Sequence, residues 1–440
     1  MYYLNKETPL SEKLLRKILD DFTTNVMPKR EKWKNYYDGA QAILNKKYQD
    51  SSKPCNKTVI NYCKNITDSY NGYLATPSFI SYSSEEDITE VMNVLRYNDY
   101  QTEDALFLKD ALVHGAAAEL MFIDNESHTR FKLIDPTKCF GIYDDSLAAD
   151  LIYFVRLYIP NPWEDEELFN VEVINDKEIT TYSMKGLSGS LTFVSQVPHY
   201  FGQCPANILL MPDEKSIFDC VMTQQDSINE LLSAEIDDYQ AFVDAYLTLE
   251  GLDADADDIA NMKENRVLLL PLGAKADWLT KNTNDAQIEN ILKRLHDSIY
   301  RTAACPDFSS ESFVGGVSSG IAIQYRLTGM ETRAATIASL LEMALRRRIE
   351  LICGIDSLKM GEEVFRDIKI TFKRNVAVDN TTTINLINTL KGSVSDETLL
   401  GQLDFIDDVG KELERVEAQK QRNMAMYGFG LSETEEEAEE

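Results

Sequence analysis

Apolar residues along this chain follow two different periods, and the change between them divides the sequence into regions. Near the start they recur at three-and-four spacing, the period of a helix with one buried face. This spacing predicts helices over residues 10–22, 28–45 and 58–75, and a helical pair between residues 87 and 114. From residue 116 to residue 194, short β-rich runs alternate with turn residues, which predicts a sheet. The expected fold class is therefore α+β and mainly helical.

The longest uninterrupted helical pattern covers residues 216–248, where no Gly or Pro occurs. At a rise of about 1.5 Å per residue, it predicts a rod of about 45 to 50 Å. A second helix is expected to begin near Asn284, because Asn284 and Gln287 have the spacing of a capping pair. Between the two rods, residues 252–282 predict a small insertion that contains one strand, Val267–Leu270.

A stretch rich in Gly and Ser follows the second rod and ends at Gly320, and we expect a mobile loop there. The helical period then resumes over residues 321–352, with a kink expected at Gly329. The last elements predicted are a strand at 368–372 and helices at 381–391, 396–404 and 407–423.

The charge of the chain changes the expected relation to nucleic acid. The formal net charge is −29, from 44 Lys and Arg against 73 Asp and Glu. Proteins that hold DNA by its phosphates normally carry a basic face, so this chain should repel DNA on average. Part of the negative charge lies in residues 426–440, which we expect to form a disordered acidic tail.

A basic run, Arg346–Arg348, stands out against this acidic background. It could contact DNA or the carboxylates of an adjacent subunit. We favour a match to the dipole at the end of the preceding helix, or a salt bridge between subunits.

Motifs for enzymatic chemistry do not occur. The only Gly-Lys pair, Gly410-Lys411, is followed by Glu412 and is no phosphate-binding loop. Neither the His-Glu-x-x-His string of zinc proteases nor the Gly-x-Ser-x-Gly string of serine hydrolases is found. We therefore predict that the chain is not an enzyme.

Metal ligands and membrane segments are also not expected. The seven cysteines form no Cys-x-x-Cys pair and the four histidines have no metal-ligand spacing, which favours free thiols and no metal or cofactor. Asp253, Asp255, Asp257 and Glu264 imitate part of a calcium loop, but Asp258 occupies the position that needs Gly. We interpret these residues as the start of an acidic helix. No run of about 18 apolar residues predicts a membrane span, and the N-terminus does not resemble a secretory signal.

Several local strings occur in a defined order along the chain. They are Tyr36-Tyr37-Asp38-Gly39, Cys55-Asn56-Lys57, Gly72-Tyr73-Leu74-Ala75-Thr76-Pro77, His199-Tyr200-Phe201-Gly202, Asn229-Glu230-Leu231-Leu232-Ser233, Glu264-Asn265-Arg266-Val267 and Ser319-Gly320-Ile321-Ala322. In this order they resemble the portal protein family of tailed double-stranded-DNA bacteriophages, in its siphophage branch. The resemblance covers roughly residues 25–423.

The resemblance implies a subunit of a closed ring, usually of twelve copies, with a wing, a stem, a clip and a crown around a central channel. It assigns residues 1–212 to an α+β wing, 213–248 and 284–302 to two stem helices, 249–283 to a β-containing clip, 303–319 to a tunnel loop, 320–375 to the long kinked helix and a wing strand, and 376–425 to a helical crown.

The resemblance also implies a role and partners. The ring would sit at one capsid vertex of the virion after assembly in the host cytoplasm, and double-stranded DNA would pass through it during packaging and ejection. Its protein partners would be the terminase large subunit, a head-completion or adaptor protein, tail proteins, and the major capsid and scaffolding proteins. The alternative is a capsid or scaffolding component that is not a portal.

Two sets of residues are the candidates for facing the DNA. The tunnel-loop set is Phe313, Val314, Gly315, Gly316, Val317, Ser318 and Ser319, for which an ordinary flexible connector is the alternative. The stem set is Glu235, Asp237, Asp238 and Asp244, for which a solvated outer helix face is an equally open alternative.

Overall fold

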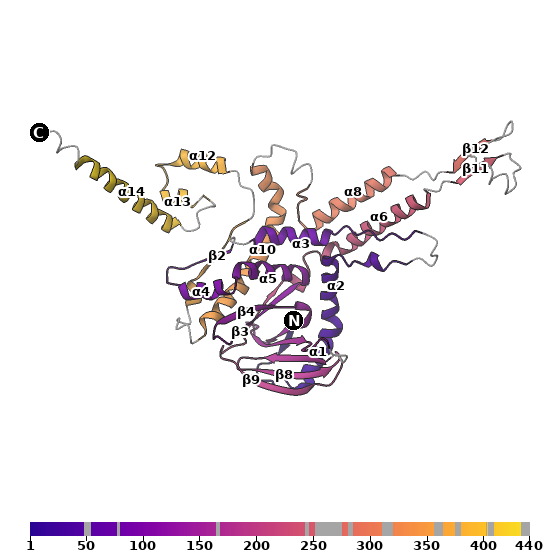
Figure 1. Cartoon of the computed structure of the whole chain (residues 1–440), viewed down its shortest axis with the longest axis horizontal. Coiled ribbons are helices and arrows are strands. Elements are labelled where there is room, and N and C mark those ends of the chain that lie inside the picture. Colours follow the sequence, from indigo (N-terminus) through magenta and orange to yellow (C-terminus); the bar gives the residue numbers. More distant parts are fainter. Residues whose placement is uncertain are drawn as a thin grey trace. The chain divides into compact units, whose positions relative to one another are not determined.

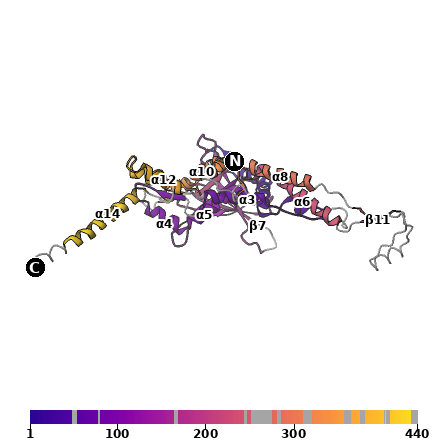
Figure 2. The same ribbon diagram turned by 90° about the horizontal axis from the view of Figure 1, so that it is seen from above.

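The computed structural model of the chain (Figures 1 and 2) consists of two units. The first comprises Met1–Gly315 and Arg326–Phe372, and the second comprises Gly316–Tyr325 and Lys373–Glu440. The residues described are 1–47, 54–76, 80–163, 168–242, 246–250, 275–279, 285–309, 320–355, 364–374, 380–401, 403 and 409–432.

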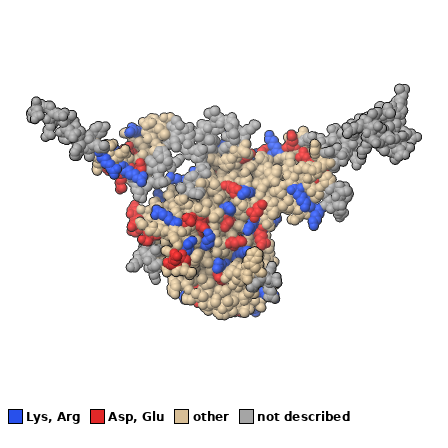
Figure 3. All heavy atoms as spheres, in the orientation of Figure 1, with Lys and Arg blue, Asp and Glu red and all other residues tan. Residues whose placement is uncertain are grey.

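The largest sheet of the first unit has six strands in the order β1-β5-β6-β7-β8-β9. Neighbouring strands are antiparallel, except that β1 is parallel to β5. The strands are Tyr2–Leu4 (β1), Cys139–Asp144 (β5), Leu151–Tyr158 (β6), Leu168–Ile174 (β7), Glu178–Lys185 (β8) and Thr192–Pro198 (β9). The sequence pattern predicted a sheet only over residues 116–194, so β1 was not expected. Charged side chains are sparse on the surface over β8 and β9 (Figure 3).

Helix α1 (Glu12–Asp21) packs against this sheet. Its first turn is fixed by Ser11, whose hydroxyl oxygen accepts a hydrogen bond from a backbone N–H of that turn. Leu15 and Leu19 are buried in one apolar core with Phe140 of β5. The predicted helix over 10–22 is thereby confirmed.

A second sheet and four helices form the rest of the first unit up to residue 210. The sheet has the order β10-β3-β4, with both pairs antiparallel. Helix α5 contacts α2, α3 and β3, so it lies between the helical layer and the sheet (Figure 1). The elements are α2 (Met27–Asp38), α3 (Tyr62–Leu74), α4 (Thr89–Tyr97), α5 (Tyr100–His114), β3 (Ala116–Ile123), β4 (Thr129–Ile134) and β10 (Ala206–Leu210).

The two predicted rods are present as α6 (Met222–Phe242) and α8 (Asp285–Thr302). The prediction that one helix continues to residue 248 is wrong. Helix α6 ends at Phe242, and β11 (Tyr246–Glu250) pairs antiparallel with β12 (Lys275–Leu279). The residues of β11 suit a strand once a partner strand is available, and their helical spacing concealed this. The strand predicted at residues 267–270 lies outside the described residues.

The remaining helices follow the predicted order. Helix α10 (Gly320–Cys353) is one continuous α-helix with Gly329 in its interior, and α11 (Val364–Asp367) precedes β13 (Lys369–Phe372). Strand β13 pairs antiparallel with β2 (Ile80–Ser83) and so joins distant parts of the first unit. Among the helices of the described residues, none is long and apolar enough to cross a membrane.

The second unit contains α12 (Asn380–Leu390), α13 (Asp396–Leu400) and α14 (Val409–Ser432). The boundary predicted for the acidic tail, residue 426, is wrong, because α14 continues to Ser432. Its last turns contain Met and Ala residues that favour helix strongly, and the two glycines among them do not end it. The rest of the predicted tail, residues 433–440, lies outside the described residues.

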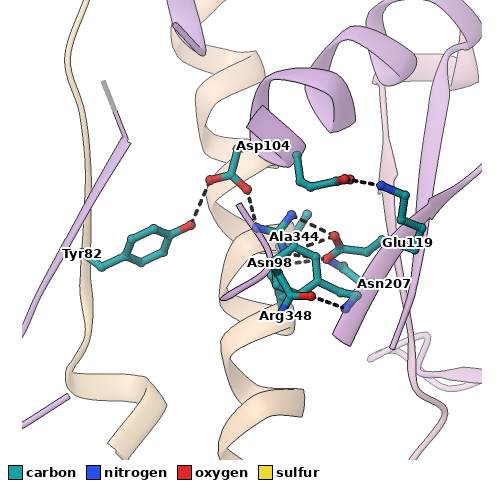
Figure 4. Close-up of polar contacts among 10 residues, drawn as sticks. Tyr82, Asn98, Asp104, Glu119, Asn207, Ala344 and Arg348 are labelled. Carbon is teal, nitrogen blue, oxygen red and sulfur yellow. Dashed lines mark hydrogen bonds and ion pairs between the residues drawn. The ribbon is translucent and has the colours of Figure 1, made fainter. Parts of the chain in front are cut away.

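A buried charge network joins α10 to both sheet and helix layers of the first unit (Figure 4). The guanidinium of Arg348 on α10 is fully buried and donates two hydrogen bonds of 2.8 Å to the carboxylate of Glu119 on β3. It also donates to Asp104 on α5. Tyr82 of β2 donates to Asp104 at 3.2 Å, and Asn207 of β10 donates to Glu119 at 2.6 Å. One side chain therefore connects elements far apart in the sequence.

The network keeps its cation charged. Burial alone would lower the pKa of Arg348, but Asp104 and Glu119 outweigh it and raise this pKa well above its ordinary value. Burial raises the pKa of Asp104, against the opposing effect of Arg348. The guanidinium also lies 4.4 Å from the ring centre of Phe131, a cation–π contact.

The interpretation of Arg346–Arg348 as a helix-end or intersubunit feature is wrong for Arg348, and Arg346 and Arg347 also have partners within the subunit. Arg348 is sealed in the network just described, where DNA cannot reach it. Arg346 donates to Glu342 at 2.9 Å, and Arg347 donates to Gln203 at 2.7 Å.

Replacing Arg348 tests how much this network contributes to the stability of the fold. Arg348→Met should lower the free energy of unfolding by about 3–5 kcal/mol, because two carboxylates would stay buried without a cation. Urea denaturation of the purified protein measures the loss. The same change at the half-exposed Arg346 is the control, and it should cost under about 1 kcal/mol. Equal losses in the two variants would contradict the role assigned to Arg348.

Candidate functional site

Helix α6 has three faces with different surroundings. One face contacts α8, where the Gln224 side chain donates to Ser298 at 3.2 Å. A second face meets an extended stretch, residues 54–61, which we call the anchored segment (Figure 1). The third face is open and contains the exposed residues Ser227 and Glu230. The two rods and the anchored segment together form the candidate site.

The anchored segment is fixed to α6 by a ladder of hydrogen bonds. Each bond joins a backbone N–H of the segment, or of the residue that follows it, to a buried polar side chain of α6. The N–H groups of Tyr62, Ile60, Thr58 and Asn56 donate to Gln225, Asn229, Ser233 and Asp237 at 3.0, 3.0, 2.9 and 2.6 Å, respectively.

The ladder forms because two repeats nearly match. Four residues of α-helix advance about 6 Å, and two residues of extended chain advance about 6.6 Å. A polar side chain on every fourth helix position can therefore meet every second N–H of a strand-like segment. The amide groups are also used as donors: Gln225 donates to the Ile60 carbonyl and Asn229 donates to Gln41, both at 2.5 Å. Because these buried polar groups are bonded, the ladder should be rigid.

The predicted stem acids lie in different surroundings. Asp237 is buried and forms the last rung of the ladder, and its carboxylate lies 3.6 Å from the Lys46 amine. Its charge is thus used inside the subunit. Glu235 is half-buried and Asp238 is exposed, while Asp244 lies outside the described residues. Whether any of these acids faces a channel stays a prediction.

A chain of polar contacts from Tyr62 through His296 to Asp307 joins the start of α3 to α8 and to the residues that follow α8. The Tyr62 hydroxyl and His296 Nδ1 are 3.1 Å apart, and His296 Nε2 lies 3.1 Å from the Asp307 carboxylate. Partial burial opposes ionisation of Asp307, but hydrogen bonds from Ser309 and His296 outweigh it and lower the pKa of this carboxyl. The carboxylate of Asp307 is therefore ionised at neutral pH and holds the chain next to His296.

The residues that lead out of α8 are held firmly, and we call residues 303–309 the loop root. The Tyr70 hydroxyl donates to the carbonyls of Ala303 and Ala304, at 3.0 Å each. Arg333 of α10 donates to the Ala303 carbonyl at 3.0 Å and to the Ile217 carbonyl at 2.9 Å. Ala304 has φ of 51°, a conformation that a residue with a side chain rarely adopts, so the surrounding bonds must hold it in place.

The predicted tunnel-loop residues 313–319 all lie outside the described residues, as do Asp253 and Glu264 of the calcium-like string. The loop root therefore ends just before the segment that was singled out from the sequence. Within the described part of the chain, no group of three or more His, Cys, Asp or Glu side chains could hold a metal ion.

Sequence reasoning missed the ladder, although a signal for it exists. Gln225, Asn229, Ser233 and Asp237 place three uncharged polar residues and one carboxylate on every fourth position of an otherwise amphipathic helix. Such a stripe usually indicates a solvated face, and only the structure shows the backbone that covers it.

Removing the two middle rungs tests the ladder. Asn229→Ala and Ser233→Ala should each lower stability by about 1–3 kcal/mol, because a buried N–H group loses its acceptor. In the combined variant, amide hydrogens at Thr58 and Ile60 should exchange at least about tenfold faster, as hydrogen-exchange mass spectrometry would show. Ser227→Ala, on the open face of the same helix, is the matched control. Unchanged exchange in the combined variant would exclude a holding role for the ladder.

Comparisons with known proteins place the chain in a family. The family model described as "Phage portal protein, SPP1 Gp6-like" matches residues 16–426. The portal protein of Bacillus phage SPP1 is 21% identical over 422 residues, which covers 90% of this chain and 82% of that protein. The chain therefore belongs to the SPP1 Gp6-like family of phage portal proteins.

Proposed function

We propose that this chain forms a closed dodecameric ring at one vertex of a phage capsid, through which double-stranded DNA enters during packaging and leaves during ejection. Membership of the portal family over most of the chain is the observation that carries this proposal. Two antiparallel rods with a β hairpin between them suit such a ring, since the rods offer long surfaces for neighbours and the hairpin extends the subunit.

The acidic charge of the chain supports a role in passing DNA rather than holding it. A wall that carries basic and aromatic side chains would bind the phosphates and stack on bases, whereas a negative wall avoids lasting contacts. With a net charge of −29 per copy, a ring would concentrate negative charge around its opening. We propose that Glu235, Asp238 and Asp244 contribute to this wall. Asp237 would contribute only through the electrostatic field of its charge, because its carboxylate is hydrogen-bonded to the anchored segment and cannot face the channel directly.

We further propose that residues 313–319 contact the moving DNA. Support comes from the resemblance and from the loop root, where Tyr70, Arg333 and His296 fix the chain shortly before these residues. A contact that yields and returns needs a firm attachment at its base, and the loop root provides one. The glycines at 315 and 316 would let the backbone approach DNA closely.

In the same proposal the ring is a structural platform without catalytic activity. The terminase large subunit would supply ATP hydrolysis, and head-completion or adaptor proteins would dock after packaging. Capsid and scaffolding proteins would surround the ring during assembly. No observation favours a capsid or scaffolding component that is not a portal.

Deleting residues 312–319 tests the role of the loop. We expect rings to assemble and enter capsids normally, while the amount of packaged DNA falls by at least about tenfold, because DNA loses its contact with the channel. Capsids produced with the variant as the sole portal would be assayed for nuclease-protected DNA. Ser227→Ala serves as a control that leaves the loop intact. Normal DNA content in the deletion variant would contradict the proposed loop function.

A further inference from the structure

The open faces of the two rods carry opposite charges. On α6, the exposed residues recur at three-and-four spacing and include one acid at mid-length, Glu230. On α8, the exposed face contains the cations Lys293, Arg294 and Arg301, with the acids Glu289 and Asp297 one turn to either side of Lys293. In the described part of the chain, Glu230, Lys293 and Arg294 take part in no ion pair. These three charged side chains therefore remain available for ion pairs outside their own subunit.

Both stripes lie on the same side of the rod pair. Helix α6 uses its other faces for α8 and for the anchored segment, and α8 uses its other faces for α6 and, through His296, for Tyr62 at the start of α3. By helical periodicity, the remaining face of each rod points away from α3 and the anchored segment. The pair therefore presents an acidic edge on α6 next to a basic edge on α8.

The acid and the bases also lie at the same height along the rods. The two rods are antiparallel, because Gln224 contacts Ser298 while Cys220 contacts the carbonyl of Thr302. In this register Glu230 is level with the turn of α8 that contains Lys293 and Arg294. In a ring whose axis ran near the rod direction, rotation about that axis would preserve this height and bring Glu230 of one copy level with Lys293 and Arg294 of the next.

We propose that neighbouring copies of this chain associate through these edges, with Glu230 on α6 of one copy paired to Lys293 and Arg294 on α8 of the next. The occupant of the open face is thus a second copy, and charge complementarity selects it. Such a contact is heterologous, since each copy offers two different surfaces, and heterologous contacts with the right rotation close into rings. This inference rests on the proposed ring.

Charge reversal with rescue tests the pairing. Glu230→Arg, and separately the pair Lys293→Glu with Arg294→Glu, should each lower the ring fraction at least about tenfold, at a concentration where the wild-type chain is entirely ring. Combining all three changes should restore the ring fraction to within about twofold of wild type, because opposite charges face each other again. Native mass spectrometry and light scattering after size-exclusion chromatography would measure the populations.

The control and the failing outcomes separate this inference from the proposed function. Glu90→Arg, on the exposed face of α4, makes the same change in net charge away from the rods and should leave rings intact. Rings that persist in the Glu230→Arg variant, or loss that the combined variant does not reverse, would overturn the pairing alone. Absence of rings in the wild-type chain would overturn the proposed function and the pairing with it.

Discussion

The fully buried cation of Arg348 connects helices and strands of the first unit that are far apart in the sequence. Arg348 is inaccessible to water, and it joins α10 to α5 and β3, with β2 and β10 attached through Tyr82 and Asn207. A buried guanidinium is tolerable only when carboxylates and hydrogen-bond acceptors surround it, so each of these elements must occupy its place for the others to be stable. Helix α10 also carries Arg333, which clamps the loop root. Helix α10 therefore connects the Arg348 network to the loop root.

The two rods depend on a second set of polar contacts, the ladder between α6 and the anchored segment. A long helix with one covered edge is stiffer than an isolated rod, and each rung removes one way for the segment to detach. Since Tyr62 belongs to the rung at Gln225 and is also a partner of His296, the ladder and the loop root form one bonded system. A displacement of the rods would therefore move residues 303–309 as well. A force on the chain after residue 309 would act on α3, α8 and α10 together, because all three are bonded to the loop root. Such coupling suits a channel that must remain intact while DNA moves through it.

Much of the architecture could be predicted from local pattern, and what escaped depends on partners distant in sequence. The rods, the long helix and the C-terminal helices follow from helical period and from Gly or Pro punctuation. Strand β1 is three residues long and exists because it pairs with β5, and β11 became a strand because β12 lies beside it. Arg348 looked like part of a surface run, since no local signal shows that Asp104 and Glu119 lie next to it. The ladder could not be predicted for the same reason. A polar stripe on a helix usually faces solvent, and only the structure shows that the backbone of residues 56–62 covers this one.

Electron cryomicroscopy of the purified full-length chain tests the central claim most directly. We expect a closed ring of identical subunits with a central opening wide enough for a DNA duplex, lined in part by the α6 and α8 rods. In each subunit, density for residues 54–61 should lie along α6. Monomers, open filaments, shells without a central opening, or rings whose rods lie far from the opening would contradict it.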